Sequence, residues 1–303
     1  MRTAFIKALC KVAAENPRVM LLTGDLGFSV LEEFAALFPD RYVNVGVAEQ
    51  NLTGVAAGLA SCGKICLTYS IANFPTLRCL EQIRNDVCYH KANVKVVSVG
   101  AGFAYGSQGY THHGIEDLSI MRSLPGMTVI APADPAEADL ATRAMIAQPG
   151  PGFLRLGKAG ETVLHKSPVE FVIGKAIKVR EGRDLTLIST GSMLRIALEV
   201  ADSLAKREIS ARVLSMHTVK PLDEEAVRAA CRETRGILTL EEHSLTGGLG
   251  SAVADVVATM NGARARFAKW GVPDMLHHRV GSQKYMLEVC GDPLAAALRL
   301  LEE

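Results

Sequence analysis

Short apolar segments alternate with helical patterns along the chain, and this alternation restricts the fold more than any other feature. In the first half, strand patterns lie at residues 19–22, 42–47, 65–69, 94–100, 127–131 and 153–156. Between and around them, helical patterns lie at residues 1–17, 30–38, 51–61, 76–90 and 135–147. Apolar strands separated by helices predict a parallel sheet with helices on both faces.

The second half repeats this order after an interruption. Residues 157–171 carry glycine, proline and charges without periodicity, which indicates an interdomain connection. Strand patterns resume at 184–190, 210–216 and 236–242, and helical patterns begin at Ser192, 223 and 250. A chain of 303 residues also exceeds the usual size of one core. We therefore predict two consecutive three-layer α/β domains with mainly parallel sheets, residues 1–165 and 166–303.

Charge and composition exclude several classes of partner. The formal net charge of +1 gives no electrostatic reason to expect nucleic acid or an anionic membrane as partner. No apolar run is long enough to span a bilayer, and Lys7 and Lys11 interrupt the first helix, which is therefore not a signal peptide. The seven cysteines show no metal-binding spacing, so we expect reduced thiols, a cytoplasmic protein and no metal ligands in this chain.

The segment VGVAEQN, residues 45–51, places one carboxylate, Glu49, between a short strand and a helix rich in small residues. One interpretation is a site for a cofactor ring, because Gly54, Ala57 and Gly58 would let another backbone approach this helix closely. The other is an ordinary turn in which the helix dipole favours an acidic first turn. The residues alone leave both open.

A second glycine-rich segment lies at residues 240–253, where Gly248 and Gly250 stand between a strand and a helix. Only two of the three glycines of a dinucleotide-binding loop have the right spacing, and no acidic residue follows about twenty positions later on a strand. Tight turning and close packing explain these glycines better than nucleotide binding does.

Four motifs of the first half carry a family resemblance. They are TGDLGFS (23–29), VGVAEQN (45–51), NFPTLRCLEQIRND (73–86) and the long segment 106–134 that begins GSQGYTHHGIEDL. In this order and spacing they resemble the transketolase family. The resemblance covers nearly the whole chain but matches only the C-terminal half of a full-length transketolase. It implies a thiamine diphosphate-binding fold pyrimidine domain followed by a transketolase C-terminal domain.

The resemblance also implies a missing half. Family members ligate the metal that bridges the cofactor diphosphate through a GDG motif, and this chain has none, since its two Gly-Asp pairs lead into Leu26 and Pro293. We therefore expect an N-terminal diphosphate-binding partner subunit that carries GDG and ligates Mg²⁺, Ca²⁺ or Mn²⁺. The chain starts directly with the first helix, which favours a natural two-subunit enzyme, an α2β2 heterotetramer with a homodimer contact.

Four positions match residues that bind the cofactor in this family. Glu49 corresponds to the catalytic glutamate that hydrogen-bonds a pyrimidine nitrogen of thiamine diphosphate and shares a proton with the ring. Phe74 corresponds to the aromatic residue that stacks on the pyrimidine. Asp25, in the TGDL turn, is carried over as a further cofactor-binding residue. Ile71 stands where other members have an aromatic residue, so this wall of the site is expected to differ.

Five positions match residues that bind the sugar. His112 corresponds to the catalytic histidine that meets hydroxyl or carbonyl oxygens, where an imidazole can pass protons near neutral pH. Arg2, Ser29 and Lys158 match a site for the sugar phosphate, with lysine replacing the usual arginine. Gln108 stands where transketolases have an aspartate that reads a substrate hydroxyl. Its neutral amide predicts an unusual sugar.

Three functions remain in view. The first is a transketolase subunit that transfers a two-carbon ketol unit from a ketose phosphate to an aldose phosphate. The second is the beta subunit of a 2-oxo-acid dehydrogenase, or an enzyme similar to deoxyxylulose phosphate synthase. The third is a non-catalytic interaction protein that retains the fold. Glu49, Phe74 and His112 together favour an enzyme, because folding does not require all three.

Overall fold

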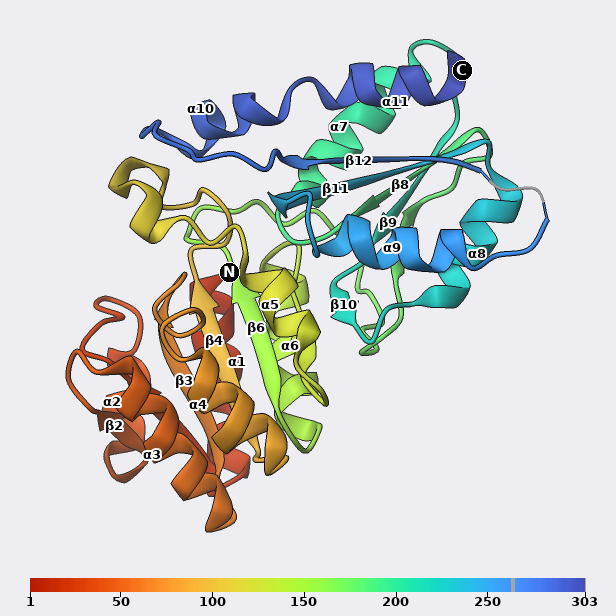
Figure 1. Cartoon of the computed structure of the whole chain (residues 1–303). Coiled ribbons are helices and arrows are strands. Elements are labelled where there is room, and N and C mark those ends of the chain that lie inside the picture. Colours follow the sequence, from red (N-terminus) through yellow and green to blue (C-terminus); the bar gives the residue numbers. More distant parts are fainter. Residues whose placement is uncertain (263–264, 303) are drawn as a thin grey trace.

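A computed structural model describes residues 1–262 and 265–302 of the chain. Two mostly parallel sheets, each covered by helices on both faces, lie one above the other (Figure 1). The expected architecture of two α/β sandwiches is therefore present. The residues matched to cofactor and sugar sites all lie between Arg2 and Lys158, and Lys158 comes just after strand β6 (Gly152–Leu156).

The larger sheet has seven strands in the order β10-β5-β6-β4-β3-β1-β2, and only the β10–β5 pair is antiparallel. Its central strands are buried along almost their whole length, because both faces are covered by helices. The strands are β1 (Val19–Thr23), β2 (Tyr42–Asn44), β3 (Ile65–Ile71), β4 (Val94–Val99), β5 (Thr128–Ile130), β6 (Gly152–Leu156) and β10 (Thr218–Lys220).

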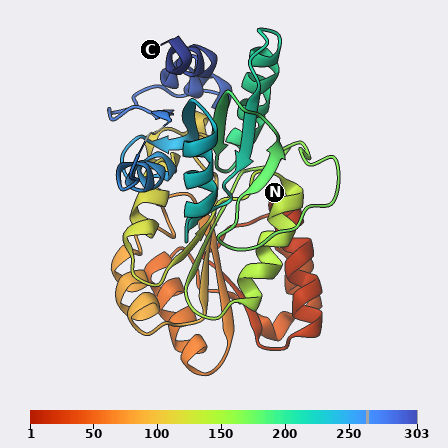
Figure 2. The same ribbon diagram turned by 90° about the vertical axis from the view of Figure 1, so that its right-hand side faces the viewer.

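Helices cover this sheet from two sides. Figure 2 shows α1 (Arg2–Glu15) and α6 (Pro135–Ala147) on one face and α3 (Glu49–Ser61), with the segment that follows β3, on the other. Asp134 starts α6 by accepting a hydrogen bond from the backbone N–H of Glu137 at 2.8 Å. The remaining elements are α2 (Glu32–Leu37), η1 (Pro39–Arg41), α4 (Leu80–Gln82), η2 (Ile83–Tyr89), η3 (Gly106–Gln108), η4 (Tyr110–His112) and α5 (Asp117–Ser123).

The smaller sheet has five strands in the order β12-β11-β8-β9-β7. In Figure 1, α7 and α11 cover one of its faces and α8 and α9 the other. Its strands are β7 (Ile177–Arg180), β8 (Leu185–Ser189), β9 (Ala211–Ser215), β11 (Gly236–Ser244) and β12 (Arg266–Val272). Its helices are α7 (Met193–Ala205), α8 (Glu224–Glu233), α9 (Leu249–Ala258), α10 (Gln283–Leu287), η5 (Glu288–Cys290) and α11 (Pro293–Glu302).

The segment between the two units contains no helix or strand from residue 157 to 176. It is fixed to the start of α6, since the N–H of Leu164 donates to Asp134 at 2.7 Å and His165 contacts the Glu137 carboxylate at 2.8 Å. Farther along the chain, β10 adds a strand to the first sheet, so the two units share structure. The division at residues 165 and 166 stays a prediction.

Two segments differ from the sequence-based expectation. The strand expected at 42–47 ends at Asn44, because the Asn44 side chain accepts the N–H groups of Asp25 and Gly46 and bends the chain there. The helix expected at 76–90 begins only at Leu80, after irregular turns, and residues 83–89 form a π-helix.

The cysteines and the lengths of the helices bear on what was expected from composition. All seven cysteines are free, and most of their side chains are buried, although Cys62 is exposed. Among the helices of residues 1–262 and 265–302, none combines the length and the apolar character that crossing a membrane requires.

Candidate active site

Glu49 is the first residue of α3, and its side chain is only 2% exposed. One carboxylate oxygen accepts a hydrogen bond from Arg78 Nη1 at 2.6 Å, and the other lies 3.5 Å from the Ser70 hydroxyl. Gly24 of the TGDL turn lies beside it, since a Cβ there would stand 3.6 Å from Glu49 Cγ. The carboxylate therefore sits at the N-terminal end of a helix, where the dipole favours a negative charge.

Phe74 and Arg78 lie next to this carboxylate. The Arg78 guanidinium carbon is 4.7 Å from the centre of the Phe74 ring, and the same guanidinium donates to Glu49. The structure thus accommodates a flat group with N–H donors between an aromatic face and a buried acceptor. An aminopyrimidine ring needs the same two partners, so the residues present fit that part of thiamine diphosphate.

The two neighbouring histidines have different environments. The ring of His112 is half-buried and meets Phe74 edge to face, with 5.2 Å between centroids. His113 is fully buried against Phe103, where desolvation lowers the pKa of its imidazole. The structure therefore brings His112, and not His113, to the Phe74 side of the site.

The other predicted cofactor residues lie at its margins. Asp25 is exposed and accepts from the Asn44 side-chain amide at 3.0 Å, with a backbone φ of 58°. Ile71 ends β3, half-buried, and packs against the hydrophobic core beside α1. Within residues 1–262 and 265–302, neither forms a hydrogen bond or an ion pair with Glu49.

The predicted sugar-binding residues come from four different segments. Arg2 begins α1, and Lys158 follows β6, with its ammonium 5.0 Å from the centre of the Tyr105 ring. Arg2 also acts on Tyr105, because its positive charge lowers the pKa of that phenol against the larger effect of burial. Ser29 and Gln108 are both exposed, on the loop before α2 and at the end of η3.

Arg78 and Tyr105 were not predicted from the sequence. Arg78 lies inside the NFPTLRCLEQIRND motif, but nothing in the motif indicates that its side chain folds back onto Phe74. Tyr105 precedes a loop whose path could not be inferred from periodicity. The only signal was Gly100, which offers room for a neighbouring ring at the end of β4.

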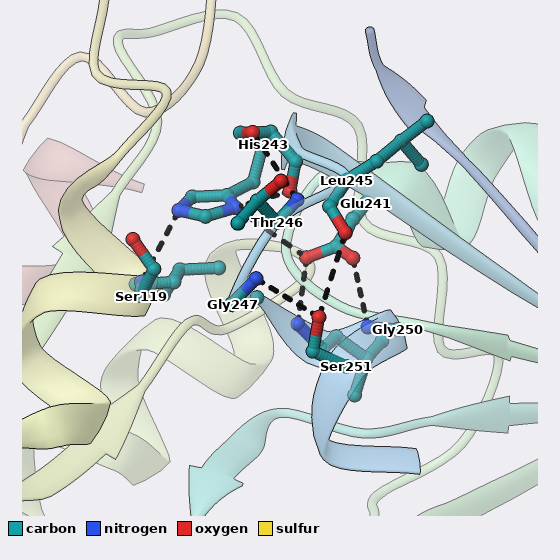
Figure 3. Close-up of polar contacts among 12 residues, drawn as sticks. Ser119, Glu241, His243, Leu245, Thr246, Gly247, Gly250 and Ser251 are labelled. Carbon is teal, nitrogen blue, oxygen red and sulfur yellow. Dashed lines mark hydrogen bonds and ion pairs between the residues drawn. The ribbon is translucent and has the colours of Figure 1, made fainter. Parts of the chain in front are cut away.

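A second group of polar side chains includes Glu241 and His243 of β11, which are fully buried and are drawn with their hydrogen-bonding neighbours in Figure 3. The Glu241 carboxylate on β11 accepts the N–H groups of Leu249 and Gly250 at 2.6 and 2.7 Å. A Cβ on Gly248 would lie 2.0 Å from this carboxylate. The carboxyl group of Glu241 therefore already accepts the first backbone N–H groups of α9.

This junction joins residues of both units. Arg155 on β6 donates to the Asp117 carboxylate at 2.8 Å and to the Glu242 backbone oxygen at 3.0 Å. His243 accepts the N–H of Ser119 at 3.2 Å, as Figure 3 shows. Burial lowers the pKa of His243 to about 4, and raises the pKa of Glu241 to about 7. We define Asp117, Arg155, Glu241, Glu242 and His243 as the junction cluster.

No group of three or more His, Cys, Asp or Glu side chains within residues 1–262 and 265–302 is arranged to hold a metal ion.

Comparisons with known proteins agree with this picture. Residues 1–160 match the family model "Transketolase, pyrimidine binding domain", and residues 174–289 match "Transketolase, C-terminal domain". The chain is 39% identical over 289 residues to the 6-deoxy-6-sulfo-D-fructose transketolase subunit SqwH of Clostridium sp. strain MSTE9, which covers 93% of this chain and 90% of that subunit.

Two further proteins are similar over most of their length. One of the subunits of the apulose-4-phosphate transketolase of Phocaeicola vulgatus is 37% identical, over 90% of this chain and 87% of that protein. A solved structure described as "Split gene transketolase, inactive beta4 tetramer" has a TM-score of 0.91 at 38% identity, covering 99% of this chain and 98% of the other.

Proposed function

Because this chain belongs to the transketolase family, we propose that it is the pyrimidine-binding and C-terminal subunit of a two-subunit, thiamine diphosphate-dependent transketolase. One observation carries the proposal: the buried Glu49 carboxylate, the Phe74 face and the His112 ring lie together around the place of one flat group. Similar proteins that are themselves named as transketolase subunits support a separate partner.

The residues of this chain would hold the cofactor and move protons. When bound, thiamine diphosphate supplies a carbon nucleophile and an electron sink for breaking and forming the bond beside the ketose carbonyl. Glu49 would hydrogen-bond a ring nitrogen and exchange a proton with it, in surroundings that exclude water. Phe74 would fix the plane of the ring, and His112 would pass protons to and from the sugar oxygens.

The partner would supply the remaining half of the site. We assign to it the GDG motif, the diphosphate and the ligands of Mg²⁺, Ca²⁺ or Mn²⁺, in an α2β2 assembly. Gly54 and Gly58 on the outer side of α3 are exposed, and a Cβ on either would meet nothing within 4 Å. A second copy of this chain could approach there, which supports a homodimer contact within the assembly. Cytoplasmic location remains part of this proposal.

The sugar would carry a terminal anion and would be unusual in its other groups. Arg2, Ser29 and Lys158 are assigned to the anion, and the exposed amide of Gln108 to a hydroxyl. The names of two similar proteins support an unusual sugar, since one is a transketolase subunit for 6-deoxy-6-sulfo-D-fructose and the other for apulose 4-phosphate.

A tagged pulldown from native extract, followed by mass spectrometry and a ketol-transfer assay with thiamine diphosphate and magnesium, tests the proposal. We expect a stoichiometric companion that contains GDG, together with ketol transfer. Carbon dioxide release from a 2-oxo acid would instead support a dehydrogenase subunit. Recovery of this chain alone, without cofactor binding, would support a non-catalytic interaction protein.

A further inference from the structure

Tyr105 lies among the basic side chains of the candidate sugar site. Its side chain is 7% exposed, the Lys158 ammonium lies 5.0 Å from its ring centre, and the His112 ring lies edge-on at 6.4 Å. The sequence motifs gave Tyr105 no role. Its position between Lys158 and His112 makes it a wall of the same site.

The Tyr105 ring fills the space beside Gly100. Gly100 has a backbone φ of +99°, and a Cβ built on it would lie 2.3 and 2.4 Å from two carbons of the Tyr105 ring. No side chain at position 100 can therefore coexist with the ring in this place. The tyrosine, and not the residue at the end of β4, determines the shape and polarity of this wall.

The hydroxyl of Tyr105 is available as a hydrogen-bond donor. Within residues 1–262 and 265–302 no hydrogen bond to this hydroxyl is present. Burial raises the pKa of the phenol, so it keeps its proton at neutral pH. A neutral hydroxyl donates to an anion without adding a charge.

The neighbouring cations have no carboxylate partner. Neither Arg2 nor Lys158 takes part in an ion pair of the described residues. Arg2 Nε is buried and likewise has no hydrogen-bond partner there. The Arg2 guanidinium also interacts with the Tyr69 phenol, so only its Nε is left without a partner. Buried polar groups are normally paired. The unpaired Nε of Arg2 and the free ammonium of Lys158, both of which act on Tyr105, therefore point to an anion that arrives with the substrate.

Building on the proposed function, we propose that Tyr105 is a specificity-determining residue whose hydroxyl donates a hydrogen bond to the terminal oxyanion of the sugar, a phosphate or a sulfonate, held between Arg2 and Lys158. The ring also prevents the end of the sugar from entering the space over Gly100. A sugar without the oxyanion would not use this contact.

The variant Tyr105→Phe tests this contact, because it removes the hydroxyl and keeps the ring against Lys158. In the complex with the partner subunit, kcat and KM would be measured with fructose 6-phosphate, with 6-deoxy-6-sulfofructose and with neutral fructose. We expect KM for the preferred oxyanion sugar to rise about five- to twentyfold with kcat nearly unchanged, and the parameters for fructose to stay the same. The charged sugar with the lower KM in the wild type shows whether the preferred oxyanion is the phosphate or the sulfonate.

A titration of the same sugars, followed by calorimetry, gives a readout that does not need turnover. The dissociation constant of the preferred oxyanion sugar should rise by the same factor in Tyr105→Phe. Tyr89→Phe, at a tyrosine that is 82% exposed, is the matched control and should change nothing. Tyr105→Leu, checked for folding by thermal unfolding, should weaken binding further because the ring over Lys158 is lost as well.

The outcomes separate the two proposals. Unchanged KM and dissociation constants in Tyr105→Phe, equal losses with fructose, or no binding of either charged sugar by the wild type would overturn the role of Tyr105. An active wild-type complex with such a result would leave the proposed function standing. Selective binding that depends on Tyr105, in a complex without any ketol transfer, would instead support the contact and contradict the proposed function.

Discussion

The candidate active site around Glu49, Phe74 and His112, which we call the open end of the first sheet, contrasts with the junction cluster. Both regions are rich in charged side chains, but they use them in opposite ways. At the open end, Glu49 is paired with a single arginine, Arg78, whose side chain is 46% exposed. At the junction, Arg155 and Asp117 are 2% and 0% exposed, and the Arg155 guanidinium donates three hydrogen bonds. The open end keeps hydrogen-bonding groups that a ligand can engage. In the junction cluster these groups are already paired within the protein.

This difference indicates that the open end serves ligand binding and that the junction cluster serves the stability of the fold. A buried charge must be paired, so a cluster whose charges are all paired holds the two sheets in one orientation. Removing one member leaves its partner buried and unpaired, which lowers the stability of the fold. A pocket that accepts a substrate must keep donors and cations unpaired until the substrate arrives. Substitutions at the open end should therefore change activity, and substitutions at the junction should change stability.

The largest effect is expected for Glu49→Gln at the open end. The amide has the same shape but cannot exchange a proton, so the ketol-transfer rate of the complex should fall about 10²- to 10⁴-fold. The thermal unfolding midpoint should stay nearly constant. Glu81→Gln, at an exposed position of α4, is the control. A rate close to that of the wild type would remove Glu49 from the chemistry.

At the junction, Arg155→Met should leave the buried Asp117 carboxylate without its cationic partner. Loss of one member of a buried ion pair typically costs about 3–5 kcal/mol in the free energy of unfolding, measured here by urea denaturation. Arg228→Met breaks an exposed pair with Glu224 on α8 and should cost less than about 0.5 kcal/mol. Equal effects of the two substitutions would show that burial of the Arg155–Asp117 pair does not increase its contribution to stability.

The junction should also make stability depend on pH. Burial lowers the pKa of His243 to about 4, and it does the same for His217, a buried histidine that precedes β10 and lies outside the cluster. An unfolded histidine takes up a proton near 6.5. Between pH 6.5 and 4 the unfolded state therefore binds more protons. The free energy of unfolding should fall in this range by up to about 1.4 kcal/mol per pH unit for each histidine.

Glu241 acts in the opposite direction and provides the check. Its pKa is raised to about 7, so its contribution to stability is present below the unfolded value near 4.5 and is lost as the pH rises to 7. Urea denaturation from acid to neutral pH should show a weaker acid loss in His243→Asn and a smaller loss toward pH 7 in Glu241→Gln. Unchanged profiles in both variants would show that these groups do not titrate as their burial requires.

The smallest effect is expected for Arg78→Ala. The guanidinium occupies the place between Glu49 and Phe74, and the cofactor has to displace it. Arg78 is 46% exposed, so solvent screens its pair with the buried Glu49 from one side, and we take the pair to be worth about 1 kcal/mol. The dissociation constant of thiamine diphosphate in the complex should therefore fall up to about fivefold by calorimetry. Arg84→Ala, at an exposed position of η2, is the control. Clearly weaker binding would mean that Arg78 helps to hold the cofactor.

Much of the fold could be predicted from apolar periodicity. The central strands β1, β3 and β4 and the helix α6 lie close to their expected ranges, because burial on both faces produces continuous apolar runs. β12 was not predicted, since it lies at a sheet edge and only its last three residues are buried. β10 has three residues, and its place is set by pairing with β5.

For the site, the motifs predicted which residues matter but not all of their neighbours. Membership of the family is confirmed, and the structure brings Glu49, Phe74 and His112 together in one place. Their roles stay predictions. Arg78 and Tyr105 could not be found in the same way, because their positions depend on how loops fold over the ends of β3 and β4.

Cofactor binding by the separate and combined subunits tests the central claim most directly. Thiamine diphosphate with magnesium would be titrated calorimetrically into this chain, into a partner subunit that contains GDG, and into their mixture, with Glu49→Gln in parallel. We predict that the mixture binds much more tightly than either chain and that Glu49→Gln weakens this binding. Binding by the mixture no tighter than by the partner alone would contradict a site shared between two subunits.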